Sequence, residues 1–195
     1  MRILAFSDVH RDVRQARRLA ERARDADVVV AAGDFASVHR GLEEMIDMLV
    51  AIETPTVLVP GNNETDEALR AACAGWSAAR VLHGEGAEIE GVPFFGLGGG
   101  VPATPWDWSF DLDEEEAADR LAACPEGGVL IVHSPPKGYV DGKRHLGSEA
   151  ILRTIEEKQP RLVICGHIHE AAGEEARVGD SRVLNAGPNG TVVAL

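Results

Sequence analysis

Side chains able to bind a metal ion follow five separate apolar runs of this chain. They are Asp8, His10, Asp34, Asn62, His133, His167 and His169. Together they offer carboxylate oxygens, an amide oxygen and imidazole nitrogens, a mixture that suits Mn, Fe or Zn. The set contains too much nitrogen for a calcium site, and it lacks the thiolates of a structural zinc site.

Seven donors are more than one metal ion needs. Two ions that share one carboxylate would use all seven, and metal pairs about 3.5–4 Å apart serve displacement reactions at phosphorus. Two divalent cations against two carboxylates leave a local charge of about +2. The whole chain carries 19 − 32 = −13 formal charges, so such a site would attract a phosphate that the remaining surface repels.

These residues need a framework that brings them together, and the apolar pattern predicts one. It predicts strands over 2–6, 27–32, 56–60, 128–132 and 161–165, and helices over 11–24, 41–52, 64–74, 114–123 and 149–158. Strands that alternate with helices at this spacing predict a parallel sheet with covered faces. Ligands bind at the carboxyl ends of such strands, so the five polar clusters should converge in space.

The pattern is less regular in the middle and at the end of the chain. Residues 79–97 predict short strands arranged as hairpins, and residues 96–110 predict a long loop rich in Gly and Pro. The stretch 181–195 predicts two antiparallel strands with a turn near 187–190. A chain of 195 residues is long enough for one domain, which we expect to cover 1–195.

The motifs, in their order along the chain, resemble the calcineurin-like metallophosphoesterase superfamily. They are Asp8-x-His10, Gly33-Asp34, Gly61-Asn62-Asn63-Glu64, His133 and Gly166-His167-x-His169. The stretches HSPPKGYVD (133–141) and CGHIHEAAG (165–173) are similar to one branch, the small metal-dependent phosphodiesterases that include cyclic-nucleotide hydrolases. The resemblance implies an α/β fold in which a double-sheet β-sandwich is flanked by helices.

The resemblance also implies how the donors divide between two divalent transition-metal ions, with Mn favoured over Fe and Zn. One ion would be held by Asp8, His10, Asp34 and His169, with Asp34 bridging to a second ion completed by Asn62, His133 and His167. A hydroxide that bridges the ions would attack phosphorus in line. The function implied is hydrolysis of a small phosphoester, most readily a phosphodiester, with cyclic nucleotides as one candidate substrate.

Asn63 departs from the family pattern, which usually has a histidine at this position. That histidine contacts the phosphate and protonates the leaving group. An asparagine can donate a hydrogen bond to a phosphoryl oxygen, but it cannot supply a proton. We therefore predict that this protein cleaves best those esters whose leaving groups need no proton, unless another acid such as His39 takes the role.

Two other functions stay open on the sequence alone. Some members of the superfamily serve as scaffolds for protein contacts, and the loss of the usual histidine would suit such a role. A scaffold has no need for seven intact ligands, which favours the enzyme. A metallohydrolase of another ester class is the third candidate. Trp106 and Trp108 could line a substrate entrance, or pack in the core or against a partner.

Bulk properties exclude several partners. The acidic balance, the few aromatic residues and the absence of a basic patch disfavour binding of long nucleic acids. No apolar stretch approaches the roughly 18–20 residues that cross a membrane. Cys73, Cys124 and Cys165 form no C-x-x-C pair, and the N-terminus is not a secretory signal. We expect a cytoplasmic protein with free thiols, and the sequence carries no sign of its oligomeric state.

Overall fold

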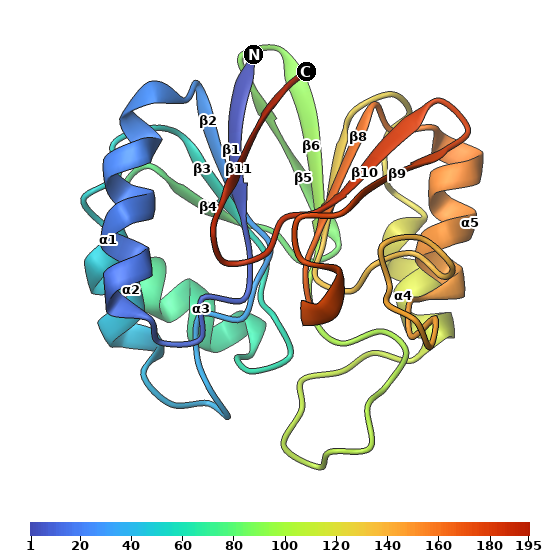
Figure 1. Ribbon diagram of the computed structural model, residues 1–195, viewed down its shortest axis with the longest axis horizontal. Helices are drawn as coiled ribbons and strands as arrows, with labels where there is room; N and C mark the ends of the chain where they lie inside the picture. The colour runs from blue at the N-terminus through green and yellow to red at the C-terminus, as the bar shows by residue number, and fades with distance from the viewer.

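Two β-sheets face each other in the computed structural model of the chain, which describes residues 1–195, and helices cover the outer face of each sheet (Figure 1). The strands are β1 Arg2–Phe6, β2 Val28–Ala31, β3 Thr56–Leu58, β4 Ala79–Val81, β5 Glu85–Ile89, β6 Val92–Leu97, β7 Val129–Val132, β8 Leu162–Cys165, β9 Glu175–Val178, β10 Ser181–Asn185 and β11 Thr191–Ala194. The helices are α1 Val13–Arg22, α2 Leu42–Leu49, α3 Asp66–Cys73, α4 Glu114–Leu121 and α5 Glu149–Lys158, with 3-10 turns η1 Ala23–Asp25 and η2 His169–Ala171. The predicted α/β sandwich flanked by helices is confirmed.

Both sheets are parallel at their centres. The first has the order β11-β1-β2-β3-β4 and the second β5-β6-β7-β8-β10-β9. Only the edge strands β11, β5 and β9 run antiparallel to their neighbours. The carboxyl ends of the parallel strands therefore meet at one edge of the sandwich, which is the lower side of the molecule in Figure 1, opposite the two chain termini.

Three apolar cores hold these layers together. Ile3 and Ala5 of β1 lie in the core between the two sheets, whereas Leu4 and Phe6 lie in the core beneath α1, α2 and α3. A third core, which includes Leu130 of β7, lies between the second sheet and the helices α4 and α5. Since both faces of the central strands are buried, these strands read as continuous apolar runs, which is why the sequence predicted them.

Side-chain caps set the ends of the helices. Ser148 accepts a hydrogen bond from the backbone N–H of Ile151 and begins α5, as its place in the sequence predicts. Asp113 and Glu116 form the capping box that their spacing predicts at α4. Helix α1 is shorter than the predicted 11–24, because Asp12 caps it and the chain tightens into η1 after Arg22.

The predicted hairpin over 181–195 is wrong. Strand β10 pairs with β8 and β9 in the second sheet, whereas β11 pairs with β1 in the first. The turn itself is present, with Gly187 at φ +60° and Gly190 at φ +72°, but it carries the chain from one sheet to the other. Each strand thereby pairs its backbone N–H and C=O groups within a sheet of several strands, whereas an isolated hairpin has only two strands and is marginally stable.

The region 79–97 is only partly a hairpin. Strand β4 pairs in parallel with β3 and completes the first sheet. Strands β5 and β6 form the expected hairpin around Gly91 and begin the second sheet. Strand β9 has no counterpart among the predicted elements, because its Glu and Arg residues break the apolar pattern at an exposed edge.

No helix is long and apolar enough to cross a membrane, and the longest helices have ten residues. The three cysteines are buried and unpaired. Burial raises the pKa of the Cys165 thiol well above its ordinary value. Cys165 thus packs as a small apolar side chain.

Candidate metal centre

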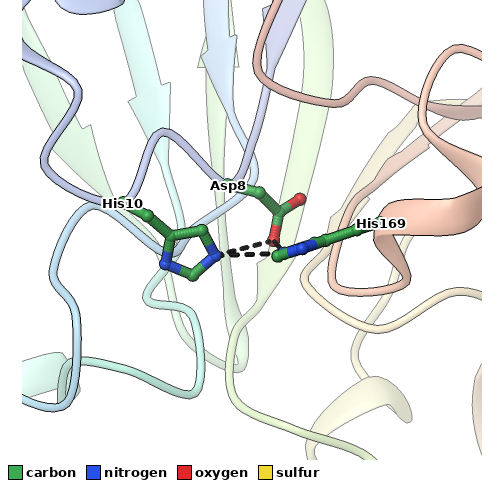
Figure 2. Close-up of side chains that lie close together, drawn as sticks. All are labelled: Asp8, His10 and His169. Atoms are coloured by element: carbon green, nitrogen blue, oxygen red, sulfur yellow. Dashed lines mark hydrogen bonds and ion pairs between the residues drawn. The ribbon is translucent and has the colours of Figure 1, made fainter.

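Histidines and carboxylates from both sheets meet at the shared carboxyl edge. Asp8 Oδ1 lies 3.5 Å from His169 Nε2 and 3.9 Å from His10 Nε2. Figure 2 shows these three side chains pointing toward one another, although His169 follows the second sheet and the other two follow β1. Asp34 lies between two groups, with Oδ2 3.5 Å from His10 Nε2 and Oδ1 3.5 Å from His133 Nε2. Side chains from distant parts of the chain therefore surround Asp8 and Asp34.

His10 and His169 have the spacing of two ligands of one ion. Their Nε2 atoms are 3.0 Å apart (Figure 2). His10 Nδ1 donates to the carbonyl oxygen of Ala36 at 3.1 Å, which leaves the lone pair on Nε2. Two nitrogens that each lie about 2.1 Å from one metal ion, with an N–metal–N angle of about 90°, are about 3.0 Å apart. Without a cation, the two nitrogens could approach this closely only by sharing a proton.

The second group of expected ligands gathers around His133. Its Nε2 lies 3.3 Å from Asn62 Oδ1, and its Nδ1 donates to the carbonyl oxygen of Ala32 at 2.7 Å. The ring of His167 packs edge-on against that of His133, with centroids 4.9 Å apart. With Asp34 Oδ1 at 3.5 Å from His133 Nε2, this group shares its carboxylate with the first.

The charges of this region fit divalent cations. Asp8 and Asp34 are 6% and 2% exposed, and the only basic side chains within 4.0 Å of their carboxylates are histidines. Buried charges are normally paired or bound to metal. No Lys or Arg compensates these carboxylates, and the donors are oxygen and imidazole nitrogen, so the residues present fit divalent metal ions.

Metal binding needs ionised carboxylates and neutral imidazoles, so a cation competes with protons for some of these ligands. Although burial opposes the shift, the Asp34 and Asp8 carboxylates raise the pKa of His133, and the hydrogen bond with Asp8 raises the pKa of His169. Asp8 and His167 are already held in the states that metal binding needs. Burial alone would raise the pKa of Asp8, but the hydrogen bond with His169 and the charge of His133 bring it down to about 2. Burial and the neighbouring His133 lower the pKa of His167 to about 3. At neutral pH, Asp8 is therefore ionised and His167 is neutral.

Four expected ligands lie on unusual backbone. Asp8, His10, Asp34 and His167 have φ values of +57°, +36°, +61° and +66°, a left-handed region that costs about 1–3 kcal/mol per residue and clusters at functional sites. The glycines of the motifs make room for the carboxylates. A Cβ at Gly61 would lie 2.0 Å from Asp34 Oδ1, and one at Gly166 would lie 2.4 Å from Asp8 Oδ2. The backbone at these strand ends is shaped around the two aspartates.

Asn63 binds Asp34 in this structure. Its backbone N–H donates to Asp34 Oδ1 at 2.9 Å, and its Nδ2 donates to Asp34 Oδ2 at 2.7 Å. Its Oδ1 accepts from the backbone N–H of Val38 at 2.8 Å. Both carboxylate oxygens of Asp34 thus receive hydrogen bonds from one residue, which makes Asn63 a positioning residue here. A contact of Asn63 with the substrate stays a prediction.

His39, the alternative acid, lies beside the centre and turns toward a loop. Its backbone N–H donates to the carbonyl oxygen of Asn63 at 2.9 Å. Its Nε2 donates to the carbonyl oxygen of Trp108, in the loop that follows β6. The structure therefore gives the His39 ring a contact with this loop rather than with the carboxylates.

Glu64 holds the centre together, although the sequence assigned it no role. It is 1% exposed. Its Oε1 accepts from the N–H groups of Asp34 and Gly61 at 2.8 and 2.7 Å, and its Oε2 accepts from that of Ala36 at 2.9 Å. One carboxylate thus ties the end of β2 to the end of β3. The signal for this role was its position directly after the two asparagines, at the end of a buried strand.

Two serines hydrogen-bond to the expected ligands, and the sequence did not predict a role for either. Ser7 Oγ donates to Asp8 Oδ2 at 2.5 Å. Ser109 Oγ accepts from Asn62 Nδ2 at 2.8 Å, which directs the amide oxygen of Asn62 toward His133. Serine is common in loops, so neither position carries a signal that sequence could separate from turn chemistry.

Glu64 should make the stability of the metal-free protein depend on pH. Burial and the adjacent Asp34 carboxylate raise the pKa of Glu64 from 4.5 to about 7. The folded value lies above the unfolded one, so the stability that Glu64 contributes is fully present below pH 4.5 and is lost as the pH rises to about 7. The free energy of unfolding should fall by on the order of 3 kcal/mol through the ionisation of Glu64. Glu64→Gln removes the titration, so urea unfolding of the EDTA-treated variant should depend less on pH than that of the wild type.

Glu114→Gln is the matched control for lost hydrogen bonds. Glu114, the first residue of α4, also accepts from two backbone N–H groups, those of Glu149 and Ala150. Its replacement removes comparable contacts without touching Asp34. A difference between Glu64→Gln and the wild type that stays constant from pH 4.5 to about 7.5 would contradict the prediction.

Comparison with known proteins agrees with this geometry. A family model described as a calcineurin-like phosphoesterase superfamily domain matches residues 1–193. The chain is 28% identical to UPF0046 protein K07C11.7 of Caenorhabditis elegans over 208 residues, 95% of this chain and 69% of that protein. It is 36% identical to metallophosphoesterase domain-containing protein 1 of Homo sapiens over 96 residues, 45% of this chain and 29% of that protein. The chain thus spans about two thirds of the first relative and under a third of the second.

Solved structures share the fold. The protein TT1561 of Thermus thermophilus has a TM-score of 0.79 at 21% identity, over 96% of this chain and 90% of that one. A dimetal phosphatase from Danio rerio has a TM-score of 0.63 at 13% identity, over 95% and 86%. A novel archaeal phosphodiesterase has a TM-score of 0.59 at 18% identity, over 96% and 84%. At these identities, the likeness shows the double-sheet architecture.

Proposed function

Because the chain belongs to the calcineurin-like phosphoesterase superfamily, we propose that it hydrolyses small phosphodiesters with the help of two divalent metal ions. The observation that carries the proposal is the position of Asp34, which contacts His10 through one carboxylate oxygen and His133 through the other. A carboxylate placed between two sets of ligands is what a pair of metal ions requires.

The ligands divide between the two sides of Asp34. Asp8, His10, Asp34 and His169 would hold one ion, and Asp34, Asn62, His133 and His167 would hold the other. The mixture of carboxylate, amide and imidazole donors favours Mn, with Fe and Zn as alternatives. Bound divalent cations supply a nucleophile at neutral pH and neutralise the charge that develops at phosphorus.

The protein itself holds the ligands in place. The backbone N–H of His167 donates to both oxygens of Asp8, at 3.1 and 3.0 Å, and Ser7 donates to one of them. Backbone carbonyl groups fix the Nδ1 protons of His10 and His133, so that each Nε2 points into the centre. Orientation of the ligands therefore does not depend on the substrate.

A small substrate fits the electrostatics better than a polymer. The formal net charge of −13 repels a long phosphate backbone, whereas a local pair of cations would attract a single phosphodiester. Asn63 has no proton to give a leaving group, which favours esters with good leaving groups. Cyclic nucleotides are one candidate class. We also propose a cytoplasmic location, which the three unpaired cysteines support.

Hydrolysis of bis-p-nitrophenyl phosphate by EDTA-treated protein, with and without added Mn²⁺, tests this function. The ester has a good leaving group, so a missing general acid should affect it least. We expect turnover that requires Mn²⁺ and that exceeds turnover of the monoester p-nitrophenyl phosphate. Preference for the monoester would contradict the phosphodiesterase assignment.

A metal-binding scaffold with weak or lost catalysis is the second candidate. The observation that favours it is the binding of Asn63 to Asp34 at the position of the usual proton donor. Tight binding of Mn²⁺ in calorimetry without turnover of either p-nitrophenyl ester would support this candidate over the enzyme.

A further inference from the structure

Two tryptophans stack on each other in the loop that follows β6. The ring centroids of Trp106 and Trp108 are 5.5 Å apart and the ring planes differ by 11°. Trp106 is 51% exposed. In contrast, Trp76 is 4% exposed and donates its indole N–H to the carbonyl oxygen of Ile52. The fold can therefore bury a tryptophan, yet it leaves the flat apolar face of Trp106 in water. Burial of this face against a ligand would stabilise the complex.

The loop is fastened to the metal centre. The Ser109 N–H donates to the carbonyl oxygen of Trp106 at 3.0 Å and closes a tight turn that holds both tryptophans beside Ser109. Ser109 Oγ accepts from the side chain of Asn62 at 2.8 Å, and the Phe110 N–H donates to the carbonyl oxygen of Asn62 at 2.9 Å. Ser109 thus links the aromatic pair to Asn62, which is an expected metal ligand.

A second loop braces the pair from the other side. The ring of His39 contacts that of Trp108 edge-on, with centroids 6.4 Å apart, and the backbone of His39 donates to Asn63. Figure 1 shows the loop between β6 and α4 extending past the carboxyl edge of the sheets. Trp106 and Trp108 are therefore held at the rim of the centre by neighbours that hydrogen-bond to the two asparagines of the 61–64 motif, Ser109 and Phe110 to Asn62 and His39 to Asn63.

We propose that the exposed face of Trp106 stacks on a flat aromatic ring of the substrate. This ring belongs to the group that stays attached to the phosphate when the leaving group departs. A nucleobase is such a ring, so the proposal narrows the proposed function, on which it rests, to phosphodiesters of nucleosides. Stacking on an indole face needs no hydrogen-bond pattern, so every base can use it. One platform beside one centre, on an acidic protein, fits a mononucleotide ester rather than a polymer.

Two esters with the same leaving group test the proposal. Thymidine 5′-(p-nitrophenyl phosphate) carries a base on the retained side, and methyl p-nitrophenyl phosphate carries none. Trp106→Ala should lower kcat/KM for the thymidine ester by about 5- to 150-fold and change that for the methyl ester by less than about twofold. Trp106→Phe keeps a flat ring and should retain most of the preference for the thymidine ester.

Leu146→Ala is the control for loss of exposed apolar surface. Leu146 is 44% exposed and belongs to the segment between β7 and α5. It should leave the ratio of the two kcat/KM values unchanged. An equal loss on both esters in Trp106→Ala, or no loss on either, would overturn the proposal, since only contact with the retained ring predicts a selective effect.

Binding measurements separate this inference from the proposed function. Calorimetry of the Mn²⁺-loaded protein with thymidine 5′-monophosphate and with methyl phosphate requires no catalysis. If the wild type hydrolyses neither ester, the proposed function fails. Tighter binding of the nucleotide that is lost in Trp106→Ala but kept in Leu146→Ala would still support the aromatic platform. Equal binding of the two phosphates by the wild type would overturn it.

Discussion

Replacement of Asp34 by asparagine should lower Mn²⁺-dependent hydrolysis of bis-p-nitrophenyl phosphate by at least about 10³-fold, because charge stabilisation by bound metal contributes several kcal/mol to such reactions. Asp34 is 2% exposed, and its two oxygens face His10 and His133, one on each side. Its loss should therefore weaken both groups of ligands together. Metal content after dialysis against Mn²⁺, measured by mass spectrometry, should fall with the activity.

The hydrogen bonds of Asp34 explain why asparagine is not a mild substitute. Both Asp34 oxygens accept from Asn63, one from its backbone N–H and one from its side-chain amide. An asparagine at position 34 has one oxygen and one NH₂ group, so one of these donors would face another donor. A buried donor left without a partner costs about 1–3 kcal/mol. The variant should thus lose stability as well as charge, and unfolding by urea should be measured beside activity.

Asp141→Asn is the control that separates the two losses. Asp141 is also 2% exposed and also pairs with a histidine, His145, at 2.9 Å. It belongs to the segment between β7 and α5 and accepts from the backbone N–H groups of Gly138 and Gly147. Its replacement should cost stability while metal content and activity remain. Full activity with two bound ions in Asp34→Asn would be incompatible with the proposed centre.

Replacement of Asn63 by histidine should increase hydrolysis of diesters with poor leaving groups by about 10²–10⁴-fold relative to diesters with good ones, which is the usual contribution of a general acid. Asn63 follows Asn62 directly and is 7% exposed next to Asp34. An imidazole at this position could carry the proton that an amide cannot supply. The measurement compares kcat/KM for bis-p-nitrophenyl phosphate with that for methyl phenyl phosphate.

The ratio of the two rates matters more than either rate alone. Histidine at position 63 would give up the hydrogen bond from Nδ2 to Asp34 Oδ2, which lowers both absolute rates by the same factor, so the added proton donor shows in their ratio. Asn63→Ala removes the same bond and adds no acid, which makes it the matched control. It should lower both rates by a similar factor. An equal change on good and poor leaving groups in Asn63→His would show that no proton donor is missing at this position.

The sequence by itself determined the central strands and most helices of this protein. The runs at β1, β2, β3, β7 and β8 are apolar along their whole length, because helices cover one face of each sheet and the other sheet covers the other face. Helix α5 has the predicted bounds of Glu149–Lys158. A strand that is buried on both faces and a capped helix are local patterns, which a single sequence displays directly.

The sequence also determined where chemistry should gather. Carboxyl ends of parallel strands share one edge of their sheet whatever the strand order, so polar residues that follow them were expected at that edge. Asp8 and His169 are 161 positions apart in the chain and follow different sheets, and they lie 3.5 Å apart because the carboxyl edges of the two stacked sheets coincide. Order within the sheet was not needed for this prediction.

Only the tertiary structure decided which strands pair and what the supporting side chains contact. The sequence of 181–195 is compatible with a hairpin, yet β10 and β11 belong to different sheets because each finds an open edge there. Asn63 orients Asp34, Glu64 joins two strand ends, and Ser109 connects Trp106 to Asn62. These contacts depend on groups brought together by packing from distant parts of the chain, and neither residue type nor spacing records which partner a polar side chain will meet.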